Sequence, residues 1–274
     1  MPALLGLFCL TLYGARGARL PADAVPAGGR ASDVRIGERQ GAAAEDARAG
    51  ERQGGPAEDA WAGERQGGAA PDAWAGERQG GAAEDLPPGR ERMVALTFDD
   101  GPHPVCTAEL LDGLKARGVR ATFFVIGENA KSEPQLVARA AAEGHRIGNH
   151  TYSHVRLTDC SEEASLGEVS RTNELLYEIT GSVTEYIRPP FGLWSRLLEE
   201  SFPLRVVLWD VDPMDWKHRD ADYIVREVLS AVEDGSIILL HDIYETSVEA
   251  ALRIVDRLQA EGYVFVTVDE LFPD

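Results

Sequence analysis

The stretch VALTFDDGP, residues 94–102, decides the fold class. Its first five residues are apolar or β-branched, which is typical of a strand buried on both faces of a sheet. Its last four residues, Asp99 to Pro102, all favour turns, so the strand ends at two adjacent carboxylates. A buried strand that opens onto polar residues at its carboxyl end is typical of a parallel α/β sheet.

Further apolar runs follow along the chain, separated by amphipathic stretches. The seven predicted strands are 94–98, 122–126, 146–149, 184–187, 205–209, 237–240 and 264–268. Capping-box spacings predict helix starts at Ser132, Asp159 and Thr246. Because strands alternate with helices, we expect a parallel sheet covered by helices. Seven strands are one fewer than a closed eight-stranded barrel needs, so we predict an α/β fold of the distorted (β/α) barrel type, with an open doubly wound sheet as the second choice.

Polar motifs follow the predicted strands rather than precede them. They are TFDDGP at 97–102, HTYSH at 150–154, RPPFG at 188–192, DVDPMDW at 210–216 and LLHD at 239–242. The carboxyl ends of parallel strands meet on one rim of the fold, and in both candidate folds the chemistry belongs there. We therefore expect these motifs to form one site.

A metal site is predicted from three residues of the first two motifs. His150 and His154, four residues apart, project together if the segment turns helically, and Asp100 supplies an oxygen ligand. Two imidazoles and one carboxylate hold a divalent cation on one face and leave positions for water and substrate. Such a pair of histidines is weak evidence alone, since chance pairs are common. Zn²⁺ is the expected ion, with Co²⁺, Ni²⁺, Mn²⁺ and Fe²⁺ as alternatives.

The neighbouring carboxylate and a later histidine could complete a hydrolase. Asp99 and Asp100 repel each other, so a metal or an arginine is needed to keep both ionised. Asp99 can then act as a base and His241 as the acid that protonates a poor leaving group. Either Asp215 or Asp212 could raise the pKa of His241. The simpler interpretations are a surface turn at 99–102 and a strand-end histidine.

Taken in order, the motifs TFDDGP, HTYSH, RPPFG, DPMDW and LLH resemble the five motifs of the polysaccharide deacetylases, the NodB homology domain of carbohydrate esterase family 4. The resemblance covers roughly residues 91–273. It implies a distorted (β/α) barrel and metal-dependent removal of N- or O-acetyl groups from polysaccharides. It also implies the site residues: Asp99 as base, Asp100, His150 and His154 as metal ligands, Arg188 orienting the base, the Phe191 backbone N–H as oxyanion donor, Asp215 tuning the acid His241, and Trp216 and Leu239 as walls of an acetyl pocket. Many relatives have Tyr where this chain has Phe191, but the implied role uses only the backbone.

Composition limits the partners. The 274 residues carry 27 basic and 46 acidic side chains, a net charge of -19, which disfavours nucleic acid and anionic lipid. The apolar run 3–13 is too short to span a membrane. We expect an acetylated glycan as the partner, and the sequence leaves the oligomeric state open.

The chain divides near residue 90. Residues 1–20 resemble a secretory signal without a basic n-region, so we expect a secreted or cell-wall-associated protein, or a cytoplasmic one if the start is assigned too early. Residues 21–90 contain four GERQ copies at a 13-residue period and too few apolar residues to fold, so we expect a disordered linker. Residues 91–274 form the predicted catalytic domain. Its Cys106 and Cys160 are expected to be two separate buried thiols, with a disulfide after export as the alternative.

The favoured substrate is a polymer containing N-acetylglucosamine, of the peptidoglycan or chitin type. Acetylated xylan, cleaved by an O-acetyl esterase, is the second choice. A non-catalytic glycan-binding module and an amidase acting on a small molecule are the rivals from other classes. The intact acid and base positions argue against the binding module, because binding alone needs neither.

Overall fold

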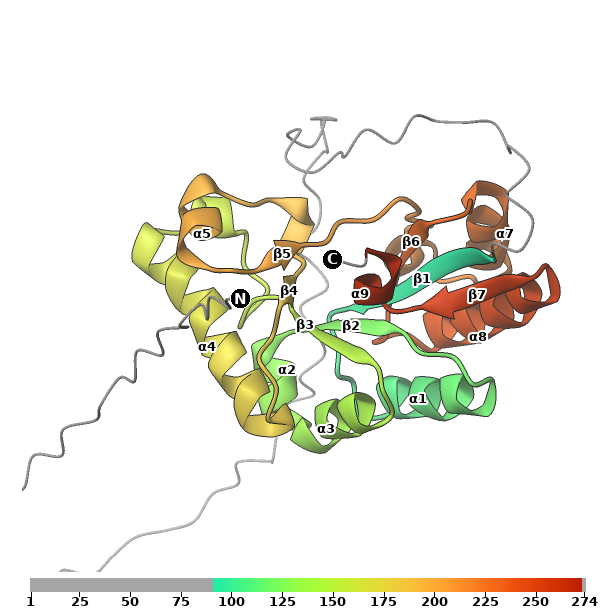
Figure 1. The fold of residues 1–274 in the computed structure, drawn as a ribbon, viewed down its shortest axis with the longest axis horizontal. Coiled ribbons are helices and arrows are strands. Elements are labelled where there is room, and N and C mark those ends of the chain that lie inside the picture. Colours follow the sequence, from blue (N-terminus) through green and yellow to red (C-terminus); the bar gives the residue numbers. More distant parts are fainter. Residues whose placement is uncertain (1–90, 273–274) are drawn as a thin grey trace, which may run out of the picture. The chain divides into compact units, whose positions relative to one another are not determined.

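The computed structural model describes residues 91–272, and these residues form a curled parallel sheet with helices around it (Figure 1). The predicted signal segment 1–20 and repeats 21–90 lie outside the described residues. All seven predicted strands are present, which confirms the distorted barrel. They are β1 (Arg92–Asp99), β2 (Thr122–Val125), β3 (Arg146–Asn149), β4 (Tyr186–Ile187), β5 (Arg205–Val206), β6 (Ser236–His241) and β7 (Tyr263–Val266).

The sheet runs in the order β5-β4-β3-β2-β1-β6, and every pairing is parallel. The first half of β1 also pairs with β7, in register from Arg92 with Tyr263, whereas its last residues pair with β2. Across the remaining gap, the segment after β5 reaches β6 through a single bridge between Val211 and Ile238. One isolated bridge in place of a full strand pairing makes this barrel distorted.

Nine α-helices and two short 3₁₀ turns connect the strands within residues 91–272. They are α1 (Cys106–Ala116), α2 (Gly127–Ser132), α3 (Pro134–Ala142), η1 (Leu157–Asp159), α4 (Glu162–Thr180), η2 (Pro190–Gly192), α5 (Arg196–Ser201), α6 (Asp215–His218), α7 (Ala221–Ala231), α8 (Glu245–Ala260) and α9 (Val268–Leu271). Helix α1 packs between α8 and α3, and α4 packs on α2 and α3 (Figure 1). None of these helices is long and apolar enough to cross a bilayer.

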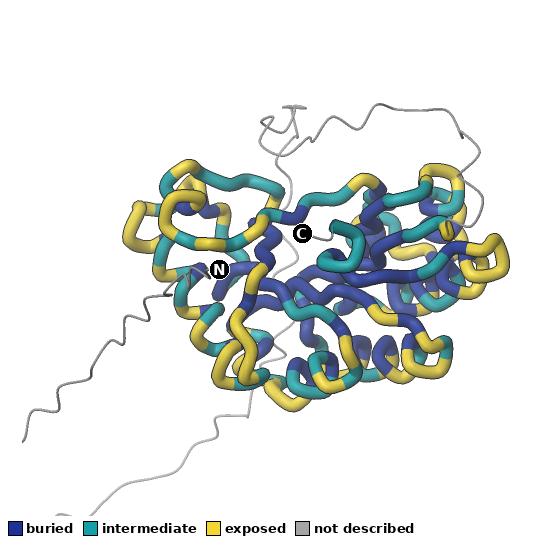
Figure 2. The backbone as a smooth tube through the Cα atoms, viewed as in Figure 1, coloured by how far each residue is buried: buried dark blue, intermediate teal, exposed yellow. Residues whose placement is uncertain are grey.

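The core lies between the sheet and its helices. Figure 2 shows the strands as the most deeply buried part of the chain and the exposed residues on the outer turns. Phe98 of β1 stacks on Phe123 of β2 at 5.2 Å between ring centroids, and both side chains are buried in the main apolar cluster. This packing fixes the strand that ends in the two carboxylates.

The predicted helix starts were wrong in detail. Ser132 closes α2, where its hydroxyl donates to the Glu128 carbonyl, and α3 begins after Glu133 instead. Helix α4 is capped by Ser161, whose hydroxyl accepts from the Ala164 N–H, and not by Asp159. Helix α8 begins at Glu245 without a side-chain cap, so Thr246 lies inside its first turn. A competing short polar residue, Ser161, caps α4, whereas α3 and α8 begin after Glu133 and Tyr244 without any side-chain cap.

Cys106 and Cys160 are free thiols in the described chain, as expected, but Cys160 is only partly buried. Cys106 is buried at the start of α1, and burial raises the pKa of its thiol. A buried thiol with a raised pKa is a poor nucleophile, so Cys106 is a packing residue.

Candidate active site

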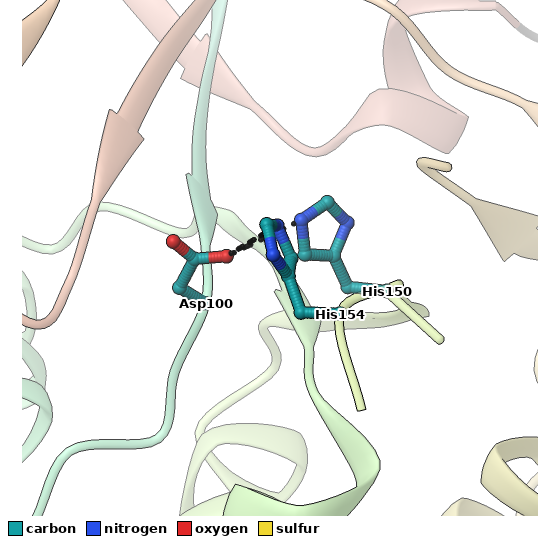
Figure 3. A group of neighbouring side chains, drawn as sticks. All are labelled: Asp100, His150 and His154. Atoms are coloured by element: carbon teal, nitrogen blue, oxygen red, sulfur yellow. Dashed lines mark ion pairs between the residues drawn. The ribbon is translucent and has the colours of Figure 1, made fainter. Parts of the chain in front are cut away.

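Three predicted metal ligands meet beyond the carboxyl ends of β1 and β3. The Oδ1 atom of Asp100 lies 3.3 Å from Nε2 of His150 and 3.3 Å from Nε2 of His154 (Figure 3). One ligand atom from each residue lies within 4.8 Å of the others. We call these three residues the metal triad.

The backbone around the metal triad is strained. Asp100 and His154 have left-handed φ values of 74° and 55°, and Thr151 between the histidines has 66°. For residues other than glycine this region is unfavourable by about 1–2 kcal/mol each. Such strain persists where the surrounding structure over-determines it, which is typical of functional sites.

The residues of the metal triad fit a divalent cation. His150 Nδ1 donates to the Arg188 carbonyl at 2.5 Å, which leaves the lone pair of its Nε2 directed at Asp100. Asp100 Oδ1 is buried and has no hydrogen-bond partner among the described residues. Its lone pairs and the lone pair of His150 Nε2 therefore face each other across 3.3 Å. Ligands held at about 2.0–2.1 Å around a tetrahedral ion lie about 3.3 Å apart, which matches this spacing.

Electrostatics keep the Asp100 carboxyl ionised. Burial raises its pKa, but the imidazoles of His150, His241 and His154 around it outweigh burial and hold the pKa below its ordinary value. An ionised oxygen is the form that ligates a metal.

Asp99 lies beside the metal triad and is held by an arginine. Its Oδ1 accepts from Nη1 of Arg188 at 2.8 Å, and its Oδ2 lies 3.7 Å from Nε2 of His150. Asp99 is 4 % exposed, so the arginine supplies the positive charge that a buried carboxylate needs. One oxygen of Asp99 is therefore anchored and the other faces the metal triad.

Arg188 is itself completely buried at the end of β4. It donates to the carbonyls of Val207 and Leu208 at 3.0 Å each and to the Thr97 hydroxyl at 2.8 Å. Its guanidinium lies over the Phe124 ring at 4.3 Å. Contacts on every side fix the direction in which it presents a proton to Asp99.

His241, at the end of β6, faces the metal triad from its other side. Its Nε2 lies 3.9 Å from Oδ2 of Asp100, and its Nδ1 donates to Oδ1 of Asp215 at 2.7 Å. Burial lowers the pKa of His241, but the Asp215 charge outweighs burial and raises it to about 10. The imidazole is therefore protonated at neutral pH.

The structure selects Asp215 over Asp212 as the partner of His241. Asp215 also accepts from the His241 N–H at 2.8 Å and from the Ser247 hydroxyl at 2.6 Å. Asp212 instead accepts from the Met214 N–H within its own loop. Ser247 gave no sequence signal, because it lies in α8, outside every motif.

The three predicted substrate-contacting residues border this site to different degrees. Phe191 is 36 % exposed, and its ring lies 5.3 Å from that of His154. Trp216 follows Asp215 directly in α6 and is partly exposed. Leu239 is buried and lies two residues before His241, so both side chains point to the same face of β6.

Two other aromatic residues near the motifs belong to the packing. Tyr152 is buried, with the Arg171 guanidinium 3.4 Å from its ring centre. Trp194 is half-buried and packs against the apolar cluster around Leu157, so both rings contribute to packing.

The chain resembles known deacetylases along the described domain. A family model described as polysaccharide deacetylase matches residues 87–203. The peptidoglycan-N-acetylmuramic acid deacetylase PdaC of Bacillus subtilis is 41 % identical over 181 residues, which are 66 % of this chain and 39 % of that protein. Its structure superposes with a TM-score of 0.65, covering 66 % of this chain and 90 % of the solved one. The present chain thus spans about two fifths of the length of PdaC.

Two shorter relatives are covered more completely. A peptidoglycan-N-acetylglucosamine deacetylase of Bacillus cereus is 42 % identical over 194 residues, covering 68 % of this chain and 70 % of that protein. A chitooligosaccharide deacetylase of Rhizobium leguminosarum bv. trifolii is 40 % identical over 191 residues, covering 63 % of this chain and 88 % of that protein.

Proposed function

The chain belongs to the polysaccharide deacetylase family, and from this premise we propose that it is a metal-dependent hydrolase that removes N-acetyl groups from polysaccharides containing N-acetylglucosamine. The observation that carries the proposal is the convergence of Asp99, the metal triad and His241 on one rim. A buried carboxylate and a protonated imidazole on two sides of one metal site are the base and the acid that amide hydrolysis requires.

The metal triad would hold one divalent cation. When bound, the cation supplies a Lewis acid that lowers the pKa of a water toward neutrality and polarises a carbonyl oxygen. We propose Zn²⁺, because two imidazoles and a carboxylate are a common zinc set, with Co²⁺, Ni²⁺, Mn²⁺ and Fe²⁺ as competitors for the same residues.

Asp99 and His241 divide the proton transfers. Asp99 Oδ2 faces the metal triad and takes a proton from the attacking water, while Arg188 holds Oδ1 in place. His241 gives its Nε2 proton to the departing nitrogen, because an amine leaves poorly unless it is protonated. Asp215 keeps the Nδ1 proton and stabilises the charged ring throughout.

The acetyl group is proposed to lie beside His241. Leu239, on the same face of β6, and Trp216, next to Asp215, would form apolar walls around its methyl group. The Phe191 backbone N–H would donate to the oxygen on which negative charge develops. These roles follow from the motif resemblance.

The names of the relatives support peptidoglycan and chitin-type chains as the substrate class. Peptidoglycan lies outside the cytoplasmic membrane, so we propose that the protein acts in the cell wall or outside the cell. The acid His241 favours an amide over the acetyl ester of xylan, since an alcohol needs less help to leave.

Acetate release from peptidoglycan, chitin oligomers and acetylated xylan tests the proposal. We expect release from the first two substrates, loss of release on chelation and recovery with Zn²⁺. Asp99→Asn and His241→Ala should lower the rate about 100-fold or more while the protein still binds metal in calorimetry. Asp159→Asn is the matched control, because its carboxylate is 72 % exposed and belongs to none of the motifs.

Three outcomes would contradict the proposal. Near-full activity of either catalytic variant would overturn the assigned roles. Glycan binding without any acetate release would indicate a binding module, and activity confined to acetylated xylan or to a small amide would indicate one of the other two hydrolases.

A further inference from the structure

The segment that joins the two histidine ligands needs support from outside itself. It comprises residues 150–154, which we call the histidine loop. Thr151 and His154 both have left-handed φ values, at 66° and 55°. These conformations are unfavourable for side chains with a Cβ, so isolated loop residues would relax out of them.

Two consecutive N–H groups of the histidine loop are bound by one carboxylate from helix α4. Oε2 of Glu168 accepts from the N–H groups of Tyr152 at 2.9 Å and Ser153 at 2.8 Å. Its Oε1 accepts from the Ser153 hydroxyl at 2.8 Å. Hydrogen bonds to a charged acceptor are about twice as strong as neutral ones, so this carboxylate is a firm anchor.

The carbonyl groups of the same loop are bound from the opposite side. The N–H groups of Gly127 and Glu128, at the start of α2, donate to the Thr151 and Tyr152 carbonyls, each at 2.9 Å. The middle of the histidine loop is therefore held between α2 and α4. Asn149 adds a further contact at the start of the loop, where its Oδ1 accepts from the Thr151 N–H at 2.7 Å. Among the described residues, only Glu168 binds the N–H groups of Tyr152 and Ser153.

The two histidines depend on this clamp to different degrees. The ring of His150 is fixed directly, because Nδ1 donates to the Arg188 carbonyl. Within residues 91–272, no hydrogen bond holds Nδ1 of His154, whose ring lies beside the rings of His150 and Phe191 and faces Asp100. The position of the His154 ring is therefore set by the backbone that carries it.

We propose that Glu168 is the positioning residue for the metal ligand His154: by binding two consecutive backbone N–H groups, it holds the histidine loop in the strained conformation that brings both imidazoles onto one oxygen of Asp100. The inference rests on the metal centre of the proposed function. Glu168 does not touch the metal triad and acts through the backbone.

Metal affinity of the full chain, measured by calorimetry with Zn²⁺ on protein stripped of metal, tests this inference. Glu168→Ala removes all three acceptor contacts and should weaken Zn²⁺ binding about 10- to 100-fold, the usual loss when a group that orients a ligand is removed. Glu168→Gln keeps one oxygen for the two N–H groups and should lose less than about 10-fold. Glu174→Ala removes an exposed glutamate from the same helix and should leave affinity unchanged.

A second measurement separates positioning from general stability. Amide hydrogen exchange at Tyr152 and Ser153 should accelerate in Glu168→Ala and stay slow in Glu174→Ala, at a temperature where all variants are folded. If Glu168→Ala does not fold, Glu168→Gln replaces it in both measurements, since the glutamine side chain has the same size as that of glutamate. The inference would be overturned if the folded Glu168→Ala variant bound Zn²⁺ as tightly as the wild type. It would also be overturned if Glu168→Gln kept wild-type Zn²⁺ affinity although its amide exchange at Tyr152 and Ser153 had accelerated. If the wild type itself bound no metal, the proposed function would fail instead.

Discussion

Replacing Arg188 by methionine tests whether the buried ion pair with Asp99 supports both the fold and the base. Methionine has a similar length and no charge, so Arg188→Met leaves little cavity but removes the cation that hydrogen-bonds to Asp99. Breaking a buried pair by removing one partner lowers the free energy of unfolding by about 3–5 kcal/mol. The loss should lie toward the upper end, because the carbonyls of Val207 and Leu208 and the hydroxyl of Thr97 also lose their donors.

A double-mutant cycle isolates the pair from these other contacts. Asp99→Asn is combined with Arg188→Met, and unfolding of all four proteins in urea is followed by tryptophan fluorescence. The cycle should give a coupling energy of about 1.5–3 kcal/mol, the value expected for a charge-assisted hydrogen bond between residues in contact.

The same variant should lose deacetylase activity about 100-fold or more, because Asp99 no longer has one oxygen fixed and the other facing the metal triad. A coupling energy below about 0.5 kcal/mol would refute the reasoning, since mutations at independent sites deviate from additivity by up to about that amount. Full activity in Arg188→Met would refute the orienting role separately from the energetic one.

Three further predictions concern single contacts. Burial lowers the pKa of His145 to about 4, so this side chain is neutral in the fold, and the stability it contributes is complete above pH 6.5 and lost as pH falls toward 4. That loss is about 3 kcal/mol. If urea unfolding showed that the free energy of unfolding falls equally between pH 6.5 and pH 4 in the wild type and in His145→Gln, the prediction would be contradicted. Asp215→Asn removes the charge that raises the pKa of His241, so the alkaline limb of the kcat/KM profile should move to lower pH and kcat should fall about 100-fold or more; an unmoved limb would contradict the pairing. Gly101→Ala would place a methyl group against the buried Asp242 carboxylate and should cost about 1–3 kcal/mol in thermal unfolding, and an unchanged Tm would contradict the close packing.

Several features of the fold were predictable because they depend on local pattern. The seven strands are short, continuous apolar runs, and all seven were found by that property alone. Helix starts were less predictable, since Ser132 and Asp159 have the right chemistry for a cap but are not the residues that packing places at the first turn. A local rule identifies candidates for a cap and does not choose among neighbours.

The candidate site likewise has residues that the sequence predicted and residues that it did not. The motifs at strand ends predicted that the metal triad, Asp99 and His241 lie together, because parallel strands bring their carboxyl ends to one rim. The motif resemblance added Arg188 as the partner of Asp99. Glu168 and Ser247 were missed, since each lies inside a helix and acts only through a contact with a distant loop or side chain. Nothing in their sequence neighbourhood distinguishes them from exposed polar residues.

By itself, the sequence determined the strand–helix alternation and the candidate residues of the site, because apolar periodicity and strand-end position are properties of neighbours along the chain. Only the tertiary structure decided which groups pair: Asp99 with Arg188, 89 residues apart, and His241 with Asp215 rather than Asp212. The physical reason is that hydrogen bonds and charge interactions depend on distances of a few ångströms through space, and those distances exist only once the barrel has curled.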